Sequence, residues 1–289
     1  MYQALYRKYR PATFDDVISQ SHITTTLKNQ IMSGKTAHAY LFTGSRGTGK
    51  TTCARIFAKA LNCEHPVNGS PCCQCDICRD ADNFALADII EIDAASNGSV
   101  NDARELREAT EYTPERCRYK IYIIDEVHML SKEAFNALLK VIEEPPPYIK
   151  FIMATTELHK VLPTILSRCQ RFDFMRIKTE DIAARLSDIA VKENITLAPD
   201  AAELIAKAAD GGMRDALSIL DRCIAFSENI TADVVSEAAS QAVTTFSLWR
   251  KPLRTRIPQK RWISSLSCTT AQRICSGCAK SWRHSFGTL

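Results

Sequence analysis

Gly44-Ser45-Arg46-Gly47-Thr48-Gly49-Lys50-Thr51 is the stretch that decides the fold of this chain. The apolar run Ala39–Thr43 precedes it and predicts a strand, and a helix is expected to follow to about Leu61. A strand, a glycine loop and a helix in this order predict a P-loop, whose backbone N–H groups surround a phosphate. Lys50 is then expected to reach the outer phosphates, and the Thr51 hydroxyl to ligate Mg²⁺. The alternative is a chance glycine turn, against which the ordered context argues.

The rest of the first 178 residues alternates short apolar runs with helical stretches, which predicts a parallel sheet covered by helices. Beyond residue 178 the strand signals stop, and apolar residues fall on one face of each helix. We therefore expect an α/β nucleotide-binding domain over residues 1–178 and a small all-helical lid domain over residues 179–242. The further predicted strands are Ile89–Asp93, Lys120–Asp125, Phe151–Ala154 and Gln170–Phe174.

Two acidic residues follow the most apolar of these strands. Asp125 comes directly after Ile123-Ile124, where a P-loop protein needs a carboxylate for Mg²⁺. Glu126 is next and is placed to orient or deprotonate an attacking water. An acidic strand end that faces water is the alternative. His128 extends the motif to Asp-Glu-Val-His, a spelling also found in some helicases, and we interpret it as a satisfied core or edge histidine.

Four cysteines within residues 63–80 have metal-ligand spacing. Cys63, Cys72, Cys75 and Cys78 follow the pattern C-x8-C-x2-C-x2-C, which can close a tetrahedral zinc site. Because the module lies between two elements of the nucleotide fold, we expect an inserted structural zinc module. A disulfide pair or free thiols are the alternatives.

Four further residues are candidates for completing the site. Thr155 and Thr156 end a predicted strand, where a hydroxyl can reach the γ-phosphate or the attacking water. Arg168 in Ser-Arg-Cys is a candidate finger for the ATP site of a neighbouring subunit. Arg214 opens a helix of the second domain and is a candidate γ-phosphate contact. Each has an alternative: the threonine pair only ends a strand, Arg168 is a solvated arginine, and Arg214 pairs with Asp215 or another surface acid.

The composition indicates a soluble globular protein. The chain has 289 residues, of which 45% are hydrophobic and 24% charged, with a net charge of +4. Residues 243–289 hold nine Lys or Arg and no acid, so the first 242 residues carry 28 basic against 33 acidic residues. We find no run long enough to span a membrane and no secretory signal, and we expect a cytoplasmic location without membrane contact.

In this order along residues 1–242, these motifs resemble one family. They are Leu5-Tyr6-Arg7-Lys8-Tyr9-Arg10-Pro11, the P-loop, the four-cysteine insertion, Asp125-Glu126-Val127-His128, Ser167-Arg168-Cys169 and Gly212-Met213-Arg214-Asp215. The family that they resemble is the gamma/tau subunits of bacterial DNA polymerase III. The resemblance implies an α/β fold of the AAA+ P-loop NTPase class, with ATP, Mg²⁺ and structural Zn²⁺ as cofactors.

The resemblance also implies roles for individual residues. It makes Asp125 and Glu126 the Walker B pair, Thr155 or its neighbour sensor 1, Arg168 the trans-acting finger and Arg214 the sensor 2 arginine. The implied nucleotide contacts are Arg7, Tyr9, Arg10, Pro11 and Val17 near the adenine, together with Gly44, Ser45, Arg46, Gly47, Thr48, Gly49, Lys50, Thr51 and Thr52 around the phosphates.

The function that the resemblance implies is ATP-dependent loading of a sliding clamp onto primed DNA, as the motor subunit of a polymerase holoenzyme. The implied partners are other clamp-loader subunits, the clamp and primer-template DNA, in a hetero-oligomer whose neighbouring subunits complete each ATP site. The chain would be an ATPase and not the polymerising subunit. Another P-loop DNA motor such as a helicase is one alternative, and a truncated ATP-binding protein without turnover is the other.

Residues 243–289 depart from the family pattern. They hold Trp249, Trp262 and Trp282 among many Arg, Ser and Thr, without a clear helical period. We interpret this segment as an atypical basic tail, disordered or translated out of frame in a truncated product. A basic arm for DNA is the alternative, because a polybasic tail attracts phosphate.

Overall fold

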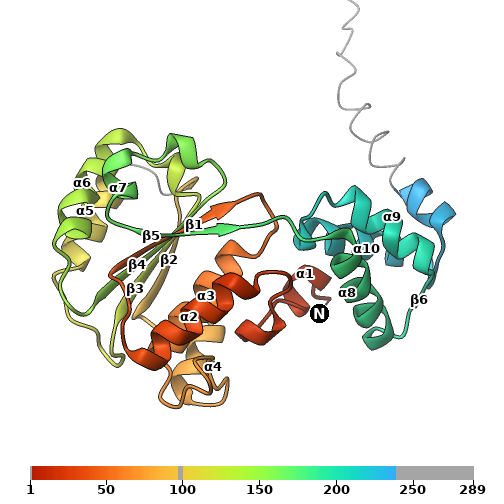
Figure 1. Cartoon of the computed structure of the whole chain (residues 1–289), viewed down its shortest axis with the longest axis horizontal. Helices are drawn as coiled ribbons and strands as arrows, with labels where there is room; N and C mark the ends of the chain where they lie inside the picture. The colour runs from red at the N-terminus through yellow and green to blue at the C-terminus, as the bar shows by residue number, and fades with distance from the viewer. Residues whose placement is uncertain (1, 97–99, 239–289) are drawn as a thin grey trace, which may run out of the picture. The chain divides into compact units, whose positions relative to one another are not determined.

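The computed structural model describes residues 2–96 and 100–238, so the predicted tail and residues 239–242 of the predicted lid lie outside it. The sheet has five parallel strands in the order β2-β3-β4-β1-β5 (Figure 1). The predicted parallel α/β fold is thereby confirmed. The strands are β1 (Ala39–Gly44), β2 (Ile89–Asp93), β3 (Lys120–Asp125), β4 (Ile149–Thr155) and β5 (Gln170–Phe174).

Helices cover both faces of the sheet (Figure 1). On one face lie α2 (Ser21–Ser33) and α3 (Lys50–Asn62), and on the other α5 (Val100–Ala109) and α6 (Lys132–Glu143). The sequence sets the limits of α6: the Ser131 hydroxyl caps it by accepting the Ala134 N–H at 3.1 Å, and prolines follow it. The shorter helices are α1 (Leu5–Lys8), η1 (Phe14–Asp16), α4 (Asp76–Asp82), η2 (Val127–Met129), η3 (Leu158–Lys160) and α7 (Pro163–Leu166).

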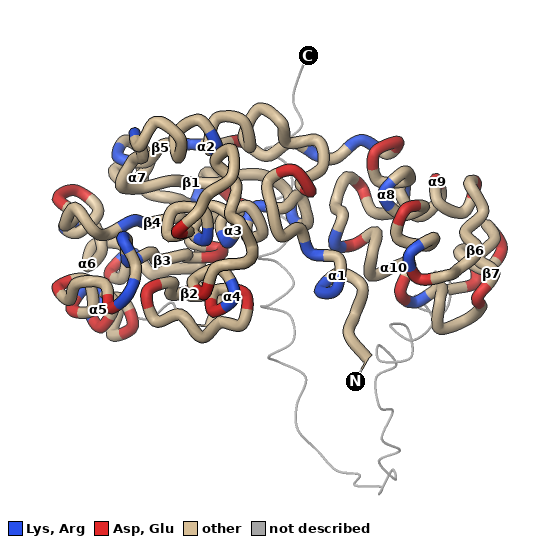
Figure 2. Tube along the Cα trace, turned by 90° about the horizontal axis from the view of Figure 1, so that it is seen from below, with Lys and Arg blue, Asp and Glu red and all other residues tan. Residues whose placement is uncertain are grey.

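The second part of the chain is helical, as expected. It contains α8 (Thr179–Lys192), α9 (Pro199–Ala208) and α10 (Met213–Phe226), which bury one apolar face each. A feature that the helical pattern did not indicate is a pair of two-residue strands, β6 (Thr196–Leu197) and β7 (Asn229–Ile230). Lys and Arg are interspersed with Asp and Glu along this part of the trace (Figure 2). Of the helices that the structure describes, none has the length and apolar character needed to cross a bilayer.

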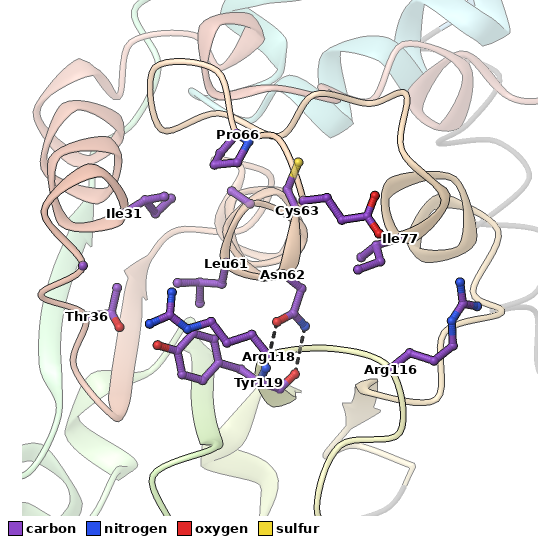
Figure 3. A pocket seen from close by; sticks show the side chains of 13 residues that line it. Ile31, Thr36, Leu61, Asn62, Cys63, Pro66, Ile77, Arg116, Arg118 and Tyr119 are labelled. Carbon is purple, nitrogen blue, oxygen red and sulfur yellow. Dashed lines mark hydrogen bonds between the residues drawn. The ribbon is translucent and has the colours of Figure 1, made fainter.

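The cysteine-rich insertion begins where α3 ends, and a paired amide fixes that end. The buried Asn62 side chain donates to the Tyr119 carbonyl at 2.9 Å and accepts the Tyr119 N–H at 3.0 Å (Figure 3). Tyr119 directly precedes β3, so the end of α3 is tied to the start of the central strand. A cavity of about 340 Å³ lies beside this pair, with Arg116 and Arg118 in its wall.

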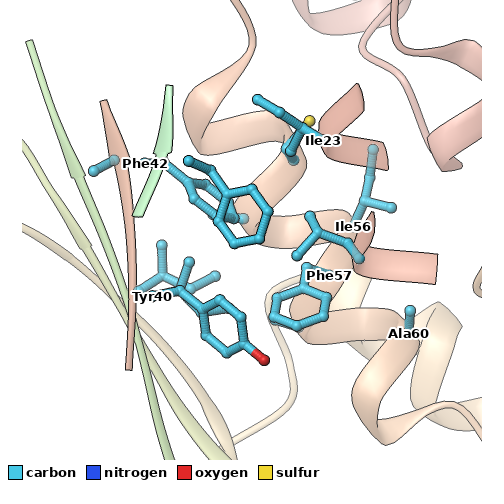
Figure 4. Close-up of a cluster of buried hydrophobic side chains, with 14 of the residues drawn as sticks. Ile23, Tyr40, Phe42, Ile56, Phe57 and Ala60 are labelled. Carbon is cyan, nitrogen blue, oxygen red and sulfur yellow. The ribbon is translucent and has the colours of Figure 1, made fainter. Parts of the chain in front are cut away.

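An aromatic core holds α3 on β1, the two elements that flank the phosphate loop. Tyr40 and Phe42 of β1 face Ile56 and Phe57 of α3, with Ile23 of α2 beside them (Figure 4). The rings of Tyr40 and Phe57 meet edge to face with centroids 4.7 Å apart. Burial of each such side chain contributes roughly 1.5–3 kcal/mol, so the two ends of the loop are held firmly.

Candidate nucleotide-binding site

The phosphate loop leaves β1 at Gly44, a position that only glycine fits. Its φ is +144°, and a Cβ there would lie 2.5 Å from the Phe174 carbonyl oxygen of β5. Further along the loop, the Thr48 hydroxyl donates to the Ser45 carbonyl at 2.8 Å. Residues 44–49 therefore form a compact turn that ends at the N-terminus of α3, where backbone N–H groups are free for an anion.

Lys50 is almost fully buried under this turn. Its ammonium donates to the carbonyls of Gly44 at 2.9 Å and Ser45 at 2.8 Å. Burial lowers its pKa, while the nearby carboxylates of Glu126 and Asp125 act in the opposite direction. The cation is thus held beside the phosphate loop, which is where a phosphate-binding lysine lies in a P-loop protein.

Thr51 and Asp125 meet although they lie 74 residues apart. The Thr51 hydroxyl donates to Asp125 Oδ2 at 2.7 Å, and Asp125 Oδ1 accepts the Glu126 N–H at 3.0 Å. One hydroxyl and one carboxylate at the carboxyl end of β3 are hard oxygen donors of the kind that Mg²⁺ prefers. The residues present therefore fit the expected ion.

Glu126 occupies an unusual position after β3. Its backbone is left-handed, with φ 48° and ψ 47°, which is uncommon outside glycine and clusters at functional sites. Its Oε2 accepts two hydrogen bonds from Thr156, from the N–H at 3.1 Å and the hydroxyl at 2.9 Å. Thr155, in contrast, is fully buried, and its hydroxyl contacts His128 and the Glu157 N–H. Of the two threonines, it is Thr156 that contacts Glu126.

A cavity of about 1310 Å³ joins these residues to the N-terminal segment and to the lid. Neither Thr155 nor Arg168 lines it. Tyr6 and Arg55 line the cavity and were not predicted. Tyr6 stands beside predicted positions, and Arg55 lies one helical turn after Thr51. The predicted residues that line it are Arg7, Tyr9, Arg10, Pro11, Val17, Arg46, Gly47, Thr48, Gly49, Lys50, Thr51, Thr52, Asp125, Glu126 and Arg214.

Two arginines of this cavity are anchored by side chains of other segments, Arg10 by Thr52 and Arg214 by Tyr6. Arg10 Nε donates to the Thr52 hydroxyl at 3.1 Å, and burial lowers the Arg10 pKa to about 10, which still leaves it charged at neutral pH. The Arg214 guanidinium lies 5.1 Å from the centroid of the Tyr6 ring, a cation–π contact. Both cations therefore border the space above the phosphate loop.

The lid is joined to the phosphate loop through the main chain. The Met213 N–H donates to the Gly47 carbonyl at 3.0 Å, and a Cβ at Gly47 would lie 3.0 Å from the Gly212 Cα. Because α10 begins at Met213, this contact places the first turn of the helix, with Arg214, directly above the loop.

Arg168 lies away from this cavity and has its own partners. Its guanidinium contacts Glu143 at 2.6 Å, the Thr164 carbonyl at 2.8 Å and the Ser167 hydroxyl at 3.0 Å. The side chain is about one-third exposed.

The four predicted metal-ligating cysteines converge. Their sulfur atoms all lie within 4.8 Å of one another, with Cys63 and Cys75 4.0 Å apart and Cys72 and Cys78 3.9 Å apart. A tetrahedral zinc with bonds of about 2.3 Å needs sulfurs about 3.8 Å apart, so the four thiols fit the ion. All four are free cysteines, so no disulfide joins them. Backbone N–H groups of Gln74 and Cys75 lower the pKa of the Cys72 thiol to about 6.

The sheet order, the phosphate loop, the acidic end of β3 and the helical lid define a P-loop ATPase fold of the AAA+ class. A solved structure of the same class, the Thermotoga maritima RuvB Holliday junction branch migration motor, matches with a TM-score of 0.60. It is 20% identical in sequence, and the match covers 81% of this chain and 72% of that one. At this identity the likeness concerns the fold alone.

The family follows from two matches in sequence. The family model described as "DNA polymerase III, delta subunit" matches residues 19–178, and the "DNA polymerase III clamp loader subunit, ATPase lid domain" matches residues 181–229. The chain belongs to this family of DNA polymerase III clamp-loader subunits, as its motifs predicted.

The similar curated relatives include tau subunits of DNA polymerase III. The Bacillus subtilis protein is 55% identical over 229 residues, which are 79% of this chain and 41% of that one. The Escherichia coli protein is 50% identical over 224 residues, 78% of this chain and 35% of that one. The chain thus spans less than half the length of these two relatives.

Proposed function

We propose that this chain binds and hydrolyses ATP as a motor subunit of a loader that places a sliding clamp on primed DNA. The observation that carries the proposal is the contact between Thr51 and Asp125 inside the cavity that also holds Lys50 and Glu126. It joins the phosphate-binding helix to the acidic strand end, the two parts that phosphoryl transfer from a nucleoside triphosphate requires.

The roles of the residues follow from their positions. The N–H groups of the loop and Lys50 would bind the phosphates, with Arg10 and Arg214 at the border of the site. Thr51 and Asp125 would hold Mg²⁺, which neutralises phosphate charge when bound. Glu126, fixed by Thr156, would accept the proton of the attacking water. We assign residues 1–178 to the nucleotide-binding domain and residues 179–242 to the lid domain.

Arg168 is proposed to act in the ATP site of a neighbouring subunit. Its distance from its own cavity and its anchoring by Glu143 support this role. A finger arginine supplied in trans stabilises transition-state charge and is worth roughly 10³–10⁵ in rate. Turnover by the chain alone is therefore expected to be slow, and related loader subunits, the clamp and primed DNA are the proposed partners. With DNA as the target, we propose that the chain acts in the cytoplasm.

The four-cysteine module is proposed to bind a structural zinc ion. The fit of the sulfur positions to a tetrahedron supports the metal, and four thiolates leave no open ligand position for catalysis. The module would hold the segment between α3 and β2 in place without touching the reaction.

The test begins with nucleotide binding. A fluorescent ATP analogue is titrated into the full chain, the Lys50→Met variant and the control Lys35→Met, whose side chain is exposed. Because one charge-assisted contact is lost, Lys50→Met should weaken binding by roughly 10- to 100-fold, and the control should bind like the unaltered chain. ATP turnover is then measured with partner loader subunits, clamp and primed DNA, together with Arg168→Ala and the control Arg171→Ala.

The outcomes separate three functions. Turnover stimulated by clamp and primed DNA, and lost in Arg168→Ala alone, supports the clamp-loader function. Unwinding of duplex DNA by the chain without partners would indicate a helicase instead. ATP binding without turnover in the complete mixture would indicate a binding protein and would overturn the proposed reaction.

A further inference from the structure

His128, the last residue of the Asp-Glu-Val-His motif, lies between the ends of β3 and β4. Its side chain is only 6% exposed. It is carried by η2, which begins directly after the left-handed residue Glu126. This turn brings the imidazole of residue 128 back to the carboxylate of residue 126.

The two ring nitrogens of His128 contact different groups. Nδ1 lies 3.1 Å from the Thr155 hydroxyl and 3.4 Å from Glu126 Oε2. Nε2 lies 3.4 Å from Glu157 Oε1. Glu157 is itself held by Lys160 at 2.9 Å and is close to His159 at 3.5 Å. The ring therefore spans the space between two carboxylates that belong to different strand ends.

The two carboxylate oxygens of Glu126 have different surroundings. Oε2 accepts hydrogen bonds from the Thr156 N–H and the Thr156 hydroxyl, and His128 Nδ1 lies 3.4 Å from it. Oε1 has no hydrogen-bond partner in the part of the chain that the structure describes, and Glu126 lines the large cavity. One oxygen is anchored and the other is left to act as a base.

We propose that His128 is a positioning residue for ATP hydrolysis and acts through Glu126. A proton on Nδ1, donated to the Thr155 hydroxyl, lies 3.4 Å from Glu126 Oε2 and attracts that oxygen, so that the carboxylate turns Oε1 toward the water. In the step that it serves, water gives a proton to Oε1 as its oxygen bonds to the γ-phosphorus and the bond from that phosphorus to the ADP oxygen breaks. This inference rests on the proposed hydrolysis of ATP.

Three variants of His128 test whether its side chain positions Glu126 or only fills a buried space. In His128→Asn the side-chain amide lies near the former Nδ1, whereas in His128→Gln it lies nearer to the former Nε2. His128→Ala removes both contacts. Because misplacement of a reacting group by about 1 Å can cost 10²-fold, the Ala and Gln variants should lower kcat by roughly 10- to 100-fold. The Asn variant should stay within about threefold of the unaltered chain.

The measurement uses the full chain with loader subunits, clamp and primed DNA. ATP affinity is recorded for every variant and should change little, because His128 does not line the cavity. The thermal midpoint is recorded as well, so that the cost of removing a buried side chain in His128→Ala is known and kcat is measured well below it. His159→Ala is the matched control, since His159 is 75% exposed and its Nε2 lies 3.5 Å from Glu157 Oε2, the oxygen that His128 does not contact. A His128→Ala variant with unchanged kcat, or rescue by Gln and not by Asn, would overturn the inference.

A double-mutant cycle gives the decisive readout. If His128 acts through Glu126, then His128→Ala should add no further loss in kcat to the Glu126→Gln variant. Independent losses that multiply would show a separate structural role and would overturn the inference. A chain that binds ATP but has no turnover overturns the proposed function together with the inference, whereas normal turnover in His128→Ala overturns the inference alone.

Discussion

Gly44→Ala tests how the phosphate loop is attached to the sheet. Alanine would have to adopt a φ of +144°, a conformation that costs on the order of 1–3 kcal/mol. Its Cβ would also lie 2.5 Å from the Phe174 carbonyl oxygen and 2.9 Å from the Phe174 Cβ. Gly44 pairs with Phe174 in the β1–β5 register, so the strands would have to separate by roughly 1 Å.

Overpacking of this kind costs about 1–3 kcal/mol, which makes the expected total about 4 kcal/mol. The thermal midpoint should then fall by roughly 8–16 °C. Gly34→Ala is the matched control, because Gly34 also has a positive φ, +68°, but no atom lies within 4 Å of its Cβ position. It should cost only about 1–2 kcal/mol.

Circular dichroism on heating and urea titration measure both variants beside the unaltered chain. ATP affinity should also fall in Gly44→Ala, because the loop begins at this residue. If Gly44→Ala loses no more stability than Gly34→Ala, the close approach of β1 to β5 is wrong, and so is the loop anchoring derived from it.

Three further results are expected. Glu126→Gln keeps an oxygen for the Thr156 contacts but loses the base. Single-turnover hydrolysis of radiolabelled ATP should therefore slow by a factor of roughly 10²–10⁴ without loss of ATP affinity. Equal hydrolysis rates in the variant and the unaltered chain would show that Glu126 is not the base. Cys72→Ser should abolish zinc content measured by mass spectrometry, whereas Cys73→Ser, whose sulfur contacts the Ala12 and Pro71 carbonyls, should retain it; zinc loss in both would place the ligands elsewhere. Burial works to raise the Asp88 pKa, but N–H groups of Arg116, Glu115 and Cys117 outweigh it and lower the pKa below its ordinary 3.8. Asp88→Asn should therefore lower the unfolding free energy by about 2 kcal/mol at pH 7. The difference in unfolding free energy between the unaltered chain and the variant should persist above pH 3.8 and shrink as the pH falls through the lower folded pKa. A difference that does not depend on pH would contradict this.

The sequence predicted the central strands β1, β3 and β4 well because they are buried along nearly their whole length. Ile89–Asp93, Lys120–Asp125 and Gln170–Phe174 have the predicted bounds, and β4 extends beyond Phe151–Ala154 at both ends. Continuous apolar runs identify such strands without any knowledge of their neighbours. The two-residue pair β6–β7 has no such run, and it forms only because the helices bring its two segments together.

The candidate site divides in the same way. The phosphate loop, Asp125 and the four cysteines are set by local spacing, and the sequence identified all of them. The contacts of Thr156 and His128 with Glu126 depend on how the ends of β3 and β4 align, which local spacing does not contain. The sequence motif does include His128, which we interpreted as a satisfied core or edge histidine. That interpretation gave no reason to expect a carboxylate near each ring nitrogen.

The hydrogen bond between the Gly47 carbonyl and the Met213 N–H couples the phosphate loop to the first turn of α10 in the lid. Both partners are backbone atoms, so a change of side chain alone does not remove the connection. A shift of the loop would therefore reach the first amide of α10, with Arg214 one residue further along the chain. Glycines at 47 and 212 permit this close approach, because a Cβ at Gly47 would lie 3.0 Å from the Gly212 Cα.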